Sequence, residues 1–118
     1  MKGARSEGEA ERAARIVAES PLVKTAIFGR DPNWGRVLAA VGRSGVEVEE
    51  ERVSVEMGGL RVFDRGRPVE FRREEGVRAL EGEEVEIVVD LGQGDVEAVF
   101  YTCDLSYDYV RINAEYTT

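Results

Sequence analysis

The first apolar pattern of the chain is that of a helix between Ser6 and Ser20. Alanines and valines recur there at intervals of three and four residues, as on one face of a helix. Ser6 and Glu9 have the spacing of a capping box, in which each side chain satisfies the other residue's backbone amide. Because Pro21 disfavours helical geometry for the residue before it, the helix is expected to end near Ser20.

A second helix is expected to begin at Asp31-Pro32, with Asp31 as the N-cap and Pro32 at the first helical position. Gly42 and Gly45 would end it. Its buried face has the i, i+3, i+4, i+7 spacing and consists of Trp34, Val37, Leu38 and Val41. The short apolar run 22–28 lies between the two helices, and its length favours a strand, although periodicity cannot separate a strand from a buried helix here.

The middle of the chain changes to the alternation of apolar and polar residues that is typical of strands. The alternating runs are 52–57, 60–63 and 85–91, and further strands are expected around Val69–Phe71 and over 96–103. Gly58-Gly59 has the composition of a hairpin turn. Short helices are predicted over 72–80 and 105–116, the latter from the spacing of Leu105, Tyr109, Ile112 and Tyr116. Helices at both ends and antiparallel hairpins between them predict a single α+β domain over 1–118, an antiparallel or mixed sheet packed with three to four helices.

Composition restricts the function. The 118 residues carry 16 basic and 24 acidic side chains, a net charge of −8, so neither nucleic acid nor an anionic membrane surface is an expected partner. No apolar run is long enough to span a bilayer and no signal peptide is expected, so we expect a cytoplasmic protein. Scarce Asn and Gln beside abundant Glu and Arg favour a thermophilic source.

Missing residue types exclude several kinds of site. The chain has no histidine and one cysteine, Cys103, which excludes a Ser-His-Asp triad, the usual zinc sites and an internal disulfide. No metal is therefore expected. Cys103 ends a predicted strand without a basic neighbour in sequence, so a small buried core residue is favoured over a reactive thiol.

Four other features carry possible chemistry. Gly92-Gln93-Gly94 lacks the third glycine and the following helix of a phosphate loop, so a hairpin turn is favoured. The glutamates of 47–51 lack calcium-loop spacing and are expected to be solvated. Gly29–Arg36 is either an anion-binding helix start or, as we favour, a structural one. Asn113 and Thr118 could clasp an amino-acid group, but a solvated tail is the alternative from the residues alone.

Three segments together resemble a known family. They are Ser20–Ala26, Asp31–Arg36 and Cys103–Ala114, and 41–45 and 89–92 fit between them. In order and over nearly the whole chain, they are similar to the C-terminal part of the bifunctional ornithine acetyltransferase/N-acetylglutamate synthase of arginine biosynthesis, within its β chain.

This resemblance implies an acyltransferase of the acetyl cycle. Members of the family are precursors that cut themselves before a threonine, which then becomes an N-terminal nucleophile with its own α-amine as a possible base. It takes acetyl from N-acetylornithine and passes it to glutamate, and acetyl-coenzyme A is a possible second donor. The family assembles α and β chains into a heterotetramer, without a metal or resident cofactor.

The resemblance also implies which parts of the machinery this chain holds. None of its threonines sits at a matching cleavage motif, so the nucleophile, the oxyanion hole and the substrate lysine are expected upstream of Met1, and the chain alone is expected to be inactive. Two substrate-binding positions carry over, Asn113 and Thr118, while Glu115 and Thr117 receive no role. The competing hypotheses are a non-catalytic acidic interaction module that binds a partner through a sheet edge, and a free-standing domain that binds an amino acid.

Overall fold

The computed structural model of the chain describes residues 1–103. The predicted helix over 105–116 lies outside the described residues. The elements in chain order are α1 (Glu7–Glu19), α2 (Pro21–Phe28), α3 (Trp34–Arg43), the short 3-10 helix η1 (Glu50–Arg52), β1 (Ser54–Met57), β2 (Leu60–Asp64), β3 (Arg67–Pro68), α4 (Arg73–Ala79) and β4 (Ile87–Asp90). No helix among the described residues has the length and apolarity to cross a membrane.

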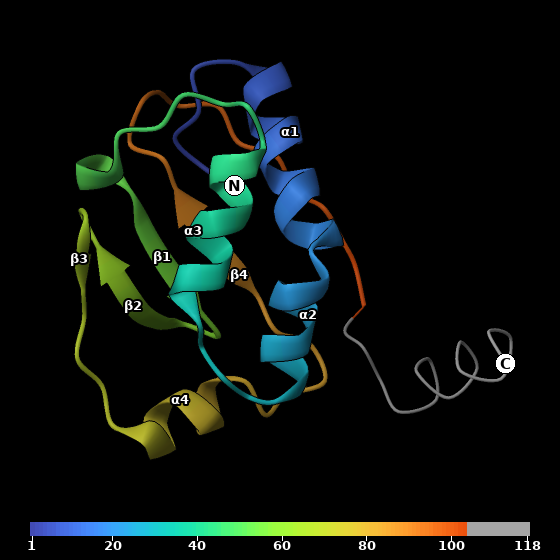
Figure 1. Ribbon diagram of the computed structural model, residues 1–118, viewed down its shortest axis with the longest axis vertical. Helices are drawn as coiled ribbons and strands as arrows, with labels where there is room; N and C mark the ends of the chain where they lie inside the picture. The colour runs from blue at the N-terminus through green and yellow to red at the C-terminus, as the bar shows by residue number, and fades with distance from the viewer. Residues whose placement is uncertain (104–118) are drawn as a thin grey trace, which may run out of the picture.

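The fold has two layers. The strands form an antiparallel sheet in the order β3-β2-β1-β4. Helices α1, α2 and α3 cover one face of this sheet, and α4 closes one end of it (Figure 1). Four α-helices and an antiparallel sheet among residues 1–103 confirm the predicted α+β class.

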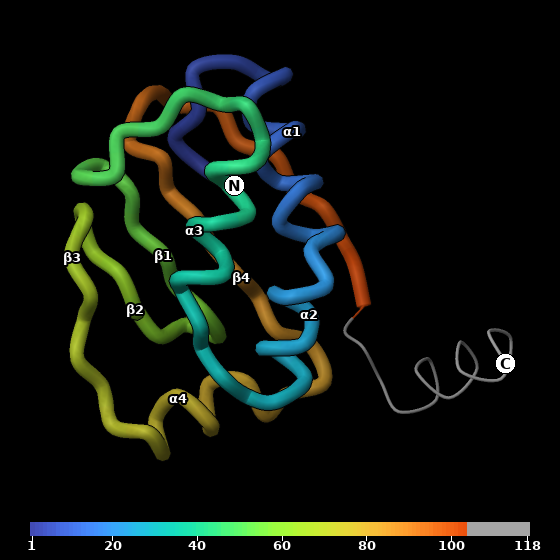
Figure 2. Tube along the Cα trace, in the orientation of Figure 1, coloured from blue at the N-terminus to red at the C-terminus, as the bar shows by residue number. Residues whose placement is uncertain are grey.

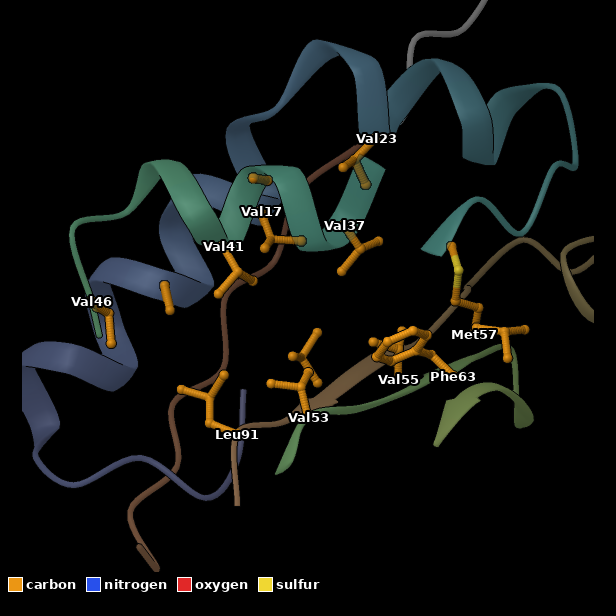
Figure 3. Packing of buried hydrophobic residues seen from close by; sticks show 14 of the residues in the cluster. Val17, Val23, Val37, Val41, Val46, Val53, Val55, Met57, Phe63 and Leu91 are labelled. Carbon is orange, nitrogen blue, oxygen red and sulfur yellow. The ribbon is translucent and has the colours of Figure 1, made fainter. Parts of the chain in front are cut away.

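The core lies between the layers, and its side chains meet from both sides (Figure 3). The helical layer and the sheet side contribute Val17, Val23, Val37, Val41, Val53, Val55, Met57, Phe63 and Leu91, all buried. The rings of Trp34 and Phe63 pack with their centroids 4.8 Å apart, which joins the start of α3 to β2. Because β-strand side chains alternate between faces, burial of Val53, Val55 and Met57 confirms the alternation predicted for this strand.

The predicted hairpin at Gly58-Gly59 is also confirmed. It joins β1 to β2, and the φ angles of the two glycines are +60° and +83°. Positive φ at both central residues is the geometry of the turn that matches strand twist, and glycine adopts it without a Cβ penalty.

Helix α1 confirms the first predicted helix but not its full cap. The Ser6 hydroxyl accepts from the amide of Glu9, at 3.2 Å. The Glu9 carboxylate instead accepts from the guanidinium of Arg5, at 3.0 Å from Nε. An ion pair with the residue four positions earlier replaces the predicted reciprocal bond.

The strand predicted over 22–28 is wrong, because this segment forms α2. The Ser20 hydroxyl caps it by accepting from the amide of Val23, and Pro21 occupies the first turn. The Thr25 hydroxyl donates to the carbonyl of Pro21, at 2.8 Å. A cap, a proline at the first turn and a covered face outweigh the strand preference of the β-branched residues.

The start of the next helix is also corrected. Helix α3 begins at Trp34, and its N-cap is Asn33, whose side-chain oxygen accepts from the amide of Arg36 at 3.1 Å. Asp31, the predicted cap, instead accepts from the Asn33 side-chain amide at 3.2 Å. Asp31 therefore orients the cap rather than serving as one.

The strand predicted over 96–103 does not form, so the hairpin turn predicted at Gly92-Gln93-Gly94 between it and 85–91 is wrong. Residues 1–4 lie between the two segments: Lys2 pairs with Asp90 in parallel, and Ala4 pairs with Val96 in antiparallel fashion. The strand expected around Val69–Phe71 does not form either, because β3 ends at Pro68. After Pro68, the Val69 amide still donates to the Val62 carbonyl. The first four residues are too short to show a period, so their part in the sheet gave no sequence signal.

Candidate functional site

The two residues that resemblance assigns to substrate, Asn113 and Thr118, lie outside the described residues. The chain leads toward them along one wall of a large groove. Residues 97–103 form this wall, with Cys103 the last described residue, and Figure 2 shows them running beside α1 and α2.

The groove has a volume of about 1080 Å³ and is open to solvent. Its floor and walls come from α1, α2, the segment 80–89 and the segment 97–103, together with Met1 and Lys2. Small apolar residues of α1 and α2 line its inner side: Ala14, Val17, Ala18, Val23 and Ile27. The small side chains of Ala14 and Ala18 on α1 leave room for the groove.

Apolar side chains remain exposed beside the groove. Phe28 is 52% exposed, Val99 69% and Tyr101 93%. Phe100 is also exposed and lies under the guanidinium of Arg15, 5.4 Å from its ring centre. Several large apolar residues gathered at one opening are typical of a surface that another polypeptide segment covers.

Acidic side chains dominate the rim. Glutamates 81, 83, 84, 86 and 97 line it, against Lys2, Lys24 and Arg30. The Met1 ammonium lies among them and donates to the carbonyl of Ala98 at 3.0 Å. Burial lowers the pKa of this amine below 8.0, while Glu97 and Glu86 act in the opposite direction.

Cys103 is exposed, so the prediction that it is a buried core residue is wrong. The strand that would have carried it inward does not form. Within residues 1–103 no group of three or more acidic or thiol side chains has the arrangement of a metal site. The glutamates of 47–51 are solvated as predicted, and Glu49 pairs with Arg52 at 2.8 Å.

The two glycine-bearing motifs have structural roles. Around Gly92 the chain turns with φ of +67°, and the Gln93 amide donates to the carbonyl of Gly3. The turn therefore holds residues 1–4 in place rather than cradling a phosphate. Near the start of α3, Arg36 donates from its guanidinium to the carbonyl of Leu22, at 2.9 Å, which ties α3 to α2.

The outer face of β1 and β2 carries a polar network that sequence patterns did not reveal. Arg61 donates to Glu56 and to Asp64, both at 3.0 Å, and these bonds raise the pKa of Arg61. Ser54 is buried and accepts from the amide of Arg65. These bonds tie β1 to β2 and so stabilise the hairpin.

Comparison with known proteins gives consistent matches over the whole chain. The model of the ArgJ family matches residues 1–118. The chain is 52% identical over 121 residues to glutamate N-acetyltransferase of Methanopyrus kandleri, and 47% identical over 118 residues to the arginine biosynthesis bifunctional protein ArgJ of Oceanobacillus iheyensis. All of this chain is covered in both cases, against 31% and 29% of the relatives.

A solved structure agrees with the fold. The crystal structure of the arginine biosynthesis bifunctional protein ArgJ of Bacillus halodurans matches with a TM-score of 0.91 and 42% identity. The match covers 98% of this chain and 55% of that one. The chain thus spans less than a third of the length of the two curated relatives and about half of the crystallised chain.

Proposed function

The chain belongs to the ArgJ family, whose model matches all of residues 1–118, and we propose that it is the C-terminal part of an acetyltransferase of this family. The observation that carries the proposal is 52% identity across the whole chain to a glutamate N-acetyltransferase. The proposed reaction moves an acetyl group from N-acetylornithine to glutamate in arginine biosynthesis.

The proposed chemistry uses two acyl transfers. The hydroxyl of an N-terminal threonine, exposed by self-cleavage elsewhere in the protein, attacks the acetyl carbonyl and ornithine leaves with a proton on its amine. The α-amine of glutamate then attacks the resulting ester, and the threonine hydroxyl is regenerated. Such a covalent route divides a difficult step into two easier ones and needs neither histidine nor a metal.

Residues of this chain would bind substrate rather than react. Asn113 offers an amide donor and acceptor, and Thr118 offers a hydroxyl, which suits the charged end of an amino acid. Partners in this proposal are the α chain and the rest of the β chain, assembled as a heterotetramer in the cytoplasm. Acetyl-coenzyme A is a possible second donor.

An assay of the isolated chain tests the proposed division of labour. Purified chain is incubated with N-acetylornithine and glutamate, and N-acetylglutamate is measured. We expect no product above the buffer blank, because the nucleophile is not in this chain. Turnover that scales with protein concentration would overturn the proposal.

Mixing this chain with the rest of a family enzyme separates the proposed function from the alternative of a non-catalytic interaction module. The Methanopyrus kandleri enzyme is produced without the region that matches this chain, and the two proteins are combined. Acetyl transfer by the mixture, absent from either part alone, supports a catalytic assembly. Copurification without acetyl transfer would favour the interaction module.

A further inference from the structure

The backbone of β4 directs the groups of alternate residues toward the groove. In β4 and the residue after it, the Val89 carbonyl accepts from the Lys2 amide and the Leu91 amide donates to the Lys2 carbonyl. Backbone groups of alternate strand residues point to the same edge, so the backbone groups of Ile87 share the edge of Val89 and Leu91. That edge faces away from β1. The residues in between direct their backbone groups toward β1, as the hydrogen bond from the Gly58 amide to the Glu86 carbonyl shows.

The opposite wall repeats this pattern. The Ala98 amide donates to the Met1 carbonyl, and the Ala98 carbonyl accepts from the Met1 ammonium. Phe100, two residues further along this wall, also lines the groove. Within residues 1–103, no hydrogen bond of a turn, loop or cap uses the Ile87 carbonyl, the Val89 amide or the backbone of Phe100.

These two edges define a gap one strand wide. Residues 1–4 fill its upper part, between β4 and the segment 96–98. Below Met1 both edges continue, along Ile87 on one side and Phe100 on the other, and all of these residues line the groove. We refer to this lower, unfilled part as the strand slot.

The Met1 ammonium occupies the position of a peptide amide in this pattern. Its hydrogen bond to Ala98 is the bond that an amide in a continuing strand would make. Desolvation disfavours its charge. A peptide bond at this position would keep the hydrogen bond and remove the charge.

The walls also specify the side chains of an occupant. Val89, Ile87 and Ala98 pack toward the core, so residues of the slot that neighbour them meet the apolar residues of α1 and α2. Residues facing outward meet Glu86 and Glu97. Apolar and basic residues in alternation are therefore complementary to the two faces.

We propose that the strand slot binds an extended segment in line with Met1–Ala4, parallel to β4 and antiparallel to 98–102, with apolar side chains inward and basic ones outward. Strand addition of this kind gains affinity from backbone hydrogen bonds and specificity from alternate side chains. The occupant is further chain of the family protein, since its relatives are more than three times as long as the stretch matched here. This last point rests on the proposed function, whereas the slot rests on the backbone alone.

Hydrogen exchange tests the slot without any activity. The full chain is extended before Met1 by Val-Lys-Val-Lys, which places valines inward and lysines outward. The control extension, Lys-Val-Lys-Val, has the same composition with the faces exchanged, because a shift of one residue moves every side chain to the other face. Amide exchange of Val89 and Phe100 is followed by NMR in both proteins and in the unextended chain.

We expect exchange at both amides to slow by about tenfold or more with the first extension and by less with the control. Equal exchange in all three proteins would overturn the proposal. Protection in the unextended chain that disappears when the chain is cut after Cys103 would assign the slot to residues 104–118. Protection that depends on protein concentration would assign the slot to a second copy. Either result overturns the proposal. Slowed exchange with no acetyl transfer in the mixing experiment would leave the slot standing and remove the proposed function.

Discussion

Single residues at the ends of elements decide where this chain turns. Asn33 shows this most clearly, because it and Asp31 are both good capping residues two positions apart. The sequence predicted Asp31 from the favourable proline that follows it. Asn33 is the cap in the structure, and the bond between the two side chains explains why both are present.

We expect Asn33→Ala to destabilise the fold by about 0.5–2 kcal/mol, since the first amides of α3 lose their acceptor. Asp31→Ala is the matched control and should cost less, because it removes only a support of the cap. Urea denaturation of both variants measures the difference. A larger loss with Asp31→Ala would show that the cap is assigned to the wrong residue.

Gly58 and Gly59 give a second residue-scale prediction. At Gly59 a Cβ meets open space, so Gly59→Ala should cost about 1–2 kcal/mol from its positive φ alone. At Gly58 a Cβ would also meet the backbone carbonyl of Ala79, so Gly58→Ala should cost more. Thermal unfolding ranks the two, and equal losses would contradict the close approach of α4 to this turn.

The Met1 amine predicts a pH dependence. Burial lowers its pKa in the folded chain, so between that lowered value and 8.0 the unfolded chain binds more protons. Stability should therefore rise with pH through this interval. Acetylation of the amine removes the titrating group. Denaturation of the acetylated and unmodified proteins from pH 6 to pH 9 therefore isolates the contribution of the Met1 amine to the free energy of unfolding. The same slope in the acetylated protein would contradict the assignment.

At the scale of elements, periodicity predicted α1, the hairpin of β1 and β2, α4 and β4, because in each the apolar pattern agrees with the local turn and cap residues. It failed for α2, where eight residues are too few to show a helical period. It failed again for 96–103, because pairing with residues 1–4 is set by contacts between the two ends of the described chain. Such non-local pairing leaves no mark in either segment.

The two-layer packing makes its own prediction. Phe63 is buried in the sheet beneath Trp34, and Phe63→Ala should cost about 3–5 kcal/mol. Phe28 is the control, since it is 52% exposed beside the groove, and Phe28→Ala should change stability by about 0.5 kcal/mol or less. Chemical denaturation gives both values, and similar losses would mean that another segment already covers Phe28 in this chain.

At the scale of the whole molecule, the described residues form a two-layer domain with an open groove beside α1 and α2. Sequence resemblance supplied the family, which the comparisons confirm over all of residues 1–118. The groove could not be predicted, because it is formed by segments that are far apart in sequence. The pattern of its exposed apolar residues is also typical of strand and core residues. The roles of Asn113 and Thr118, and the thermophilic source, stay predictions.

A chimera in which this chain replaces the matching region of the Methanopyrus kandleri enzyme tests whether the chain completes the substrate pocket. We expect the chimera to transfer acetyl from N-acetylornithine to glutamate. In the chimera, Asn113→Ala and Thr118→Ala should each raise KM by about tenfold or more, as expected for the loss of a hydrogen bond to a charged group. The neighbouring Thr117→Ala should have little effect. An active chimera that tolerates Asn113→Ala and Thr118→Ala as well as it tolerates Thr117→Ala would contradict the claim that this chain completes the substrate pocket.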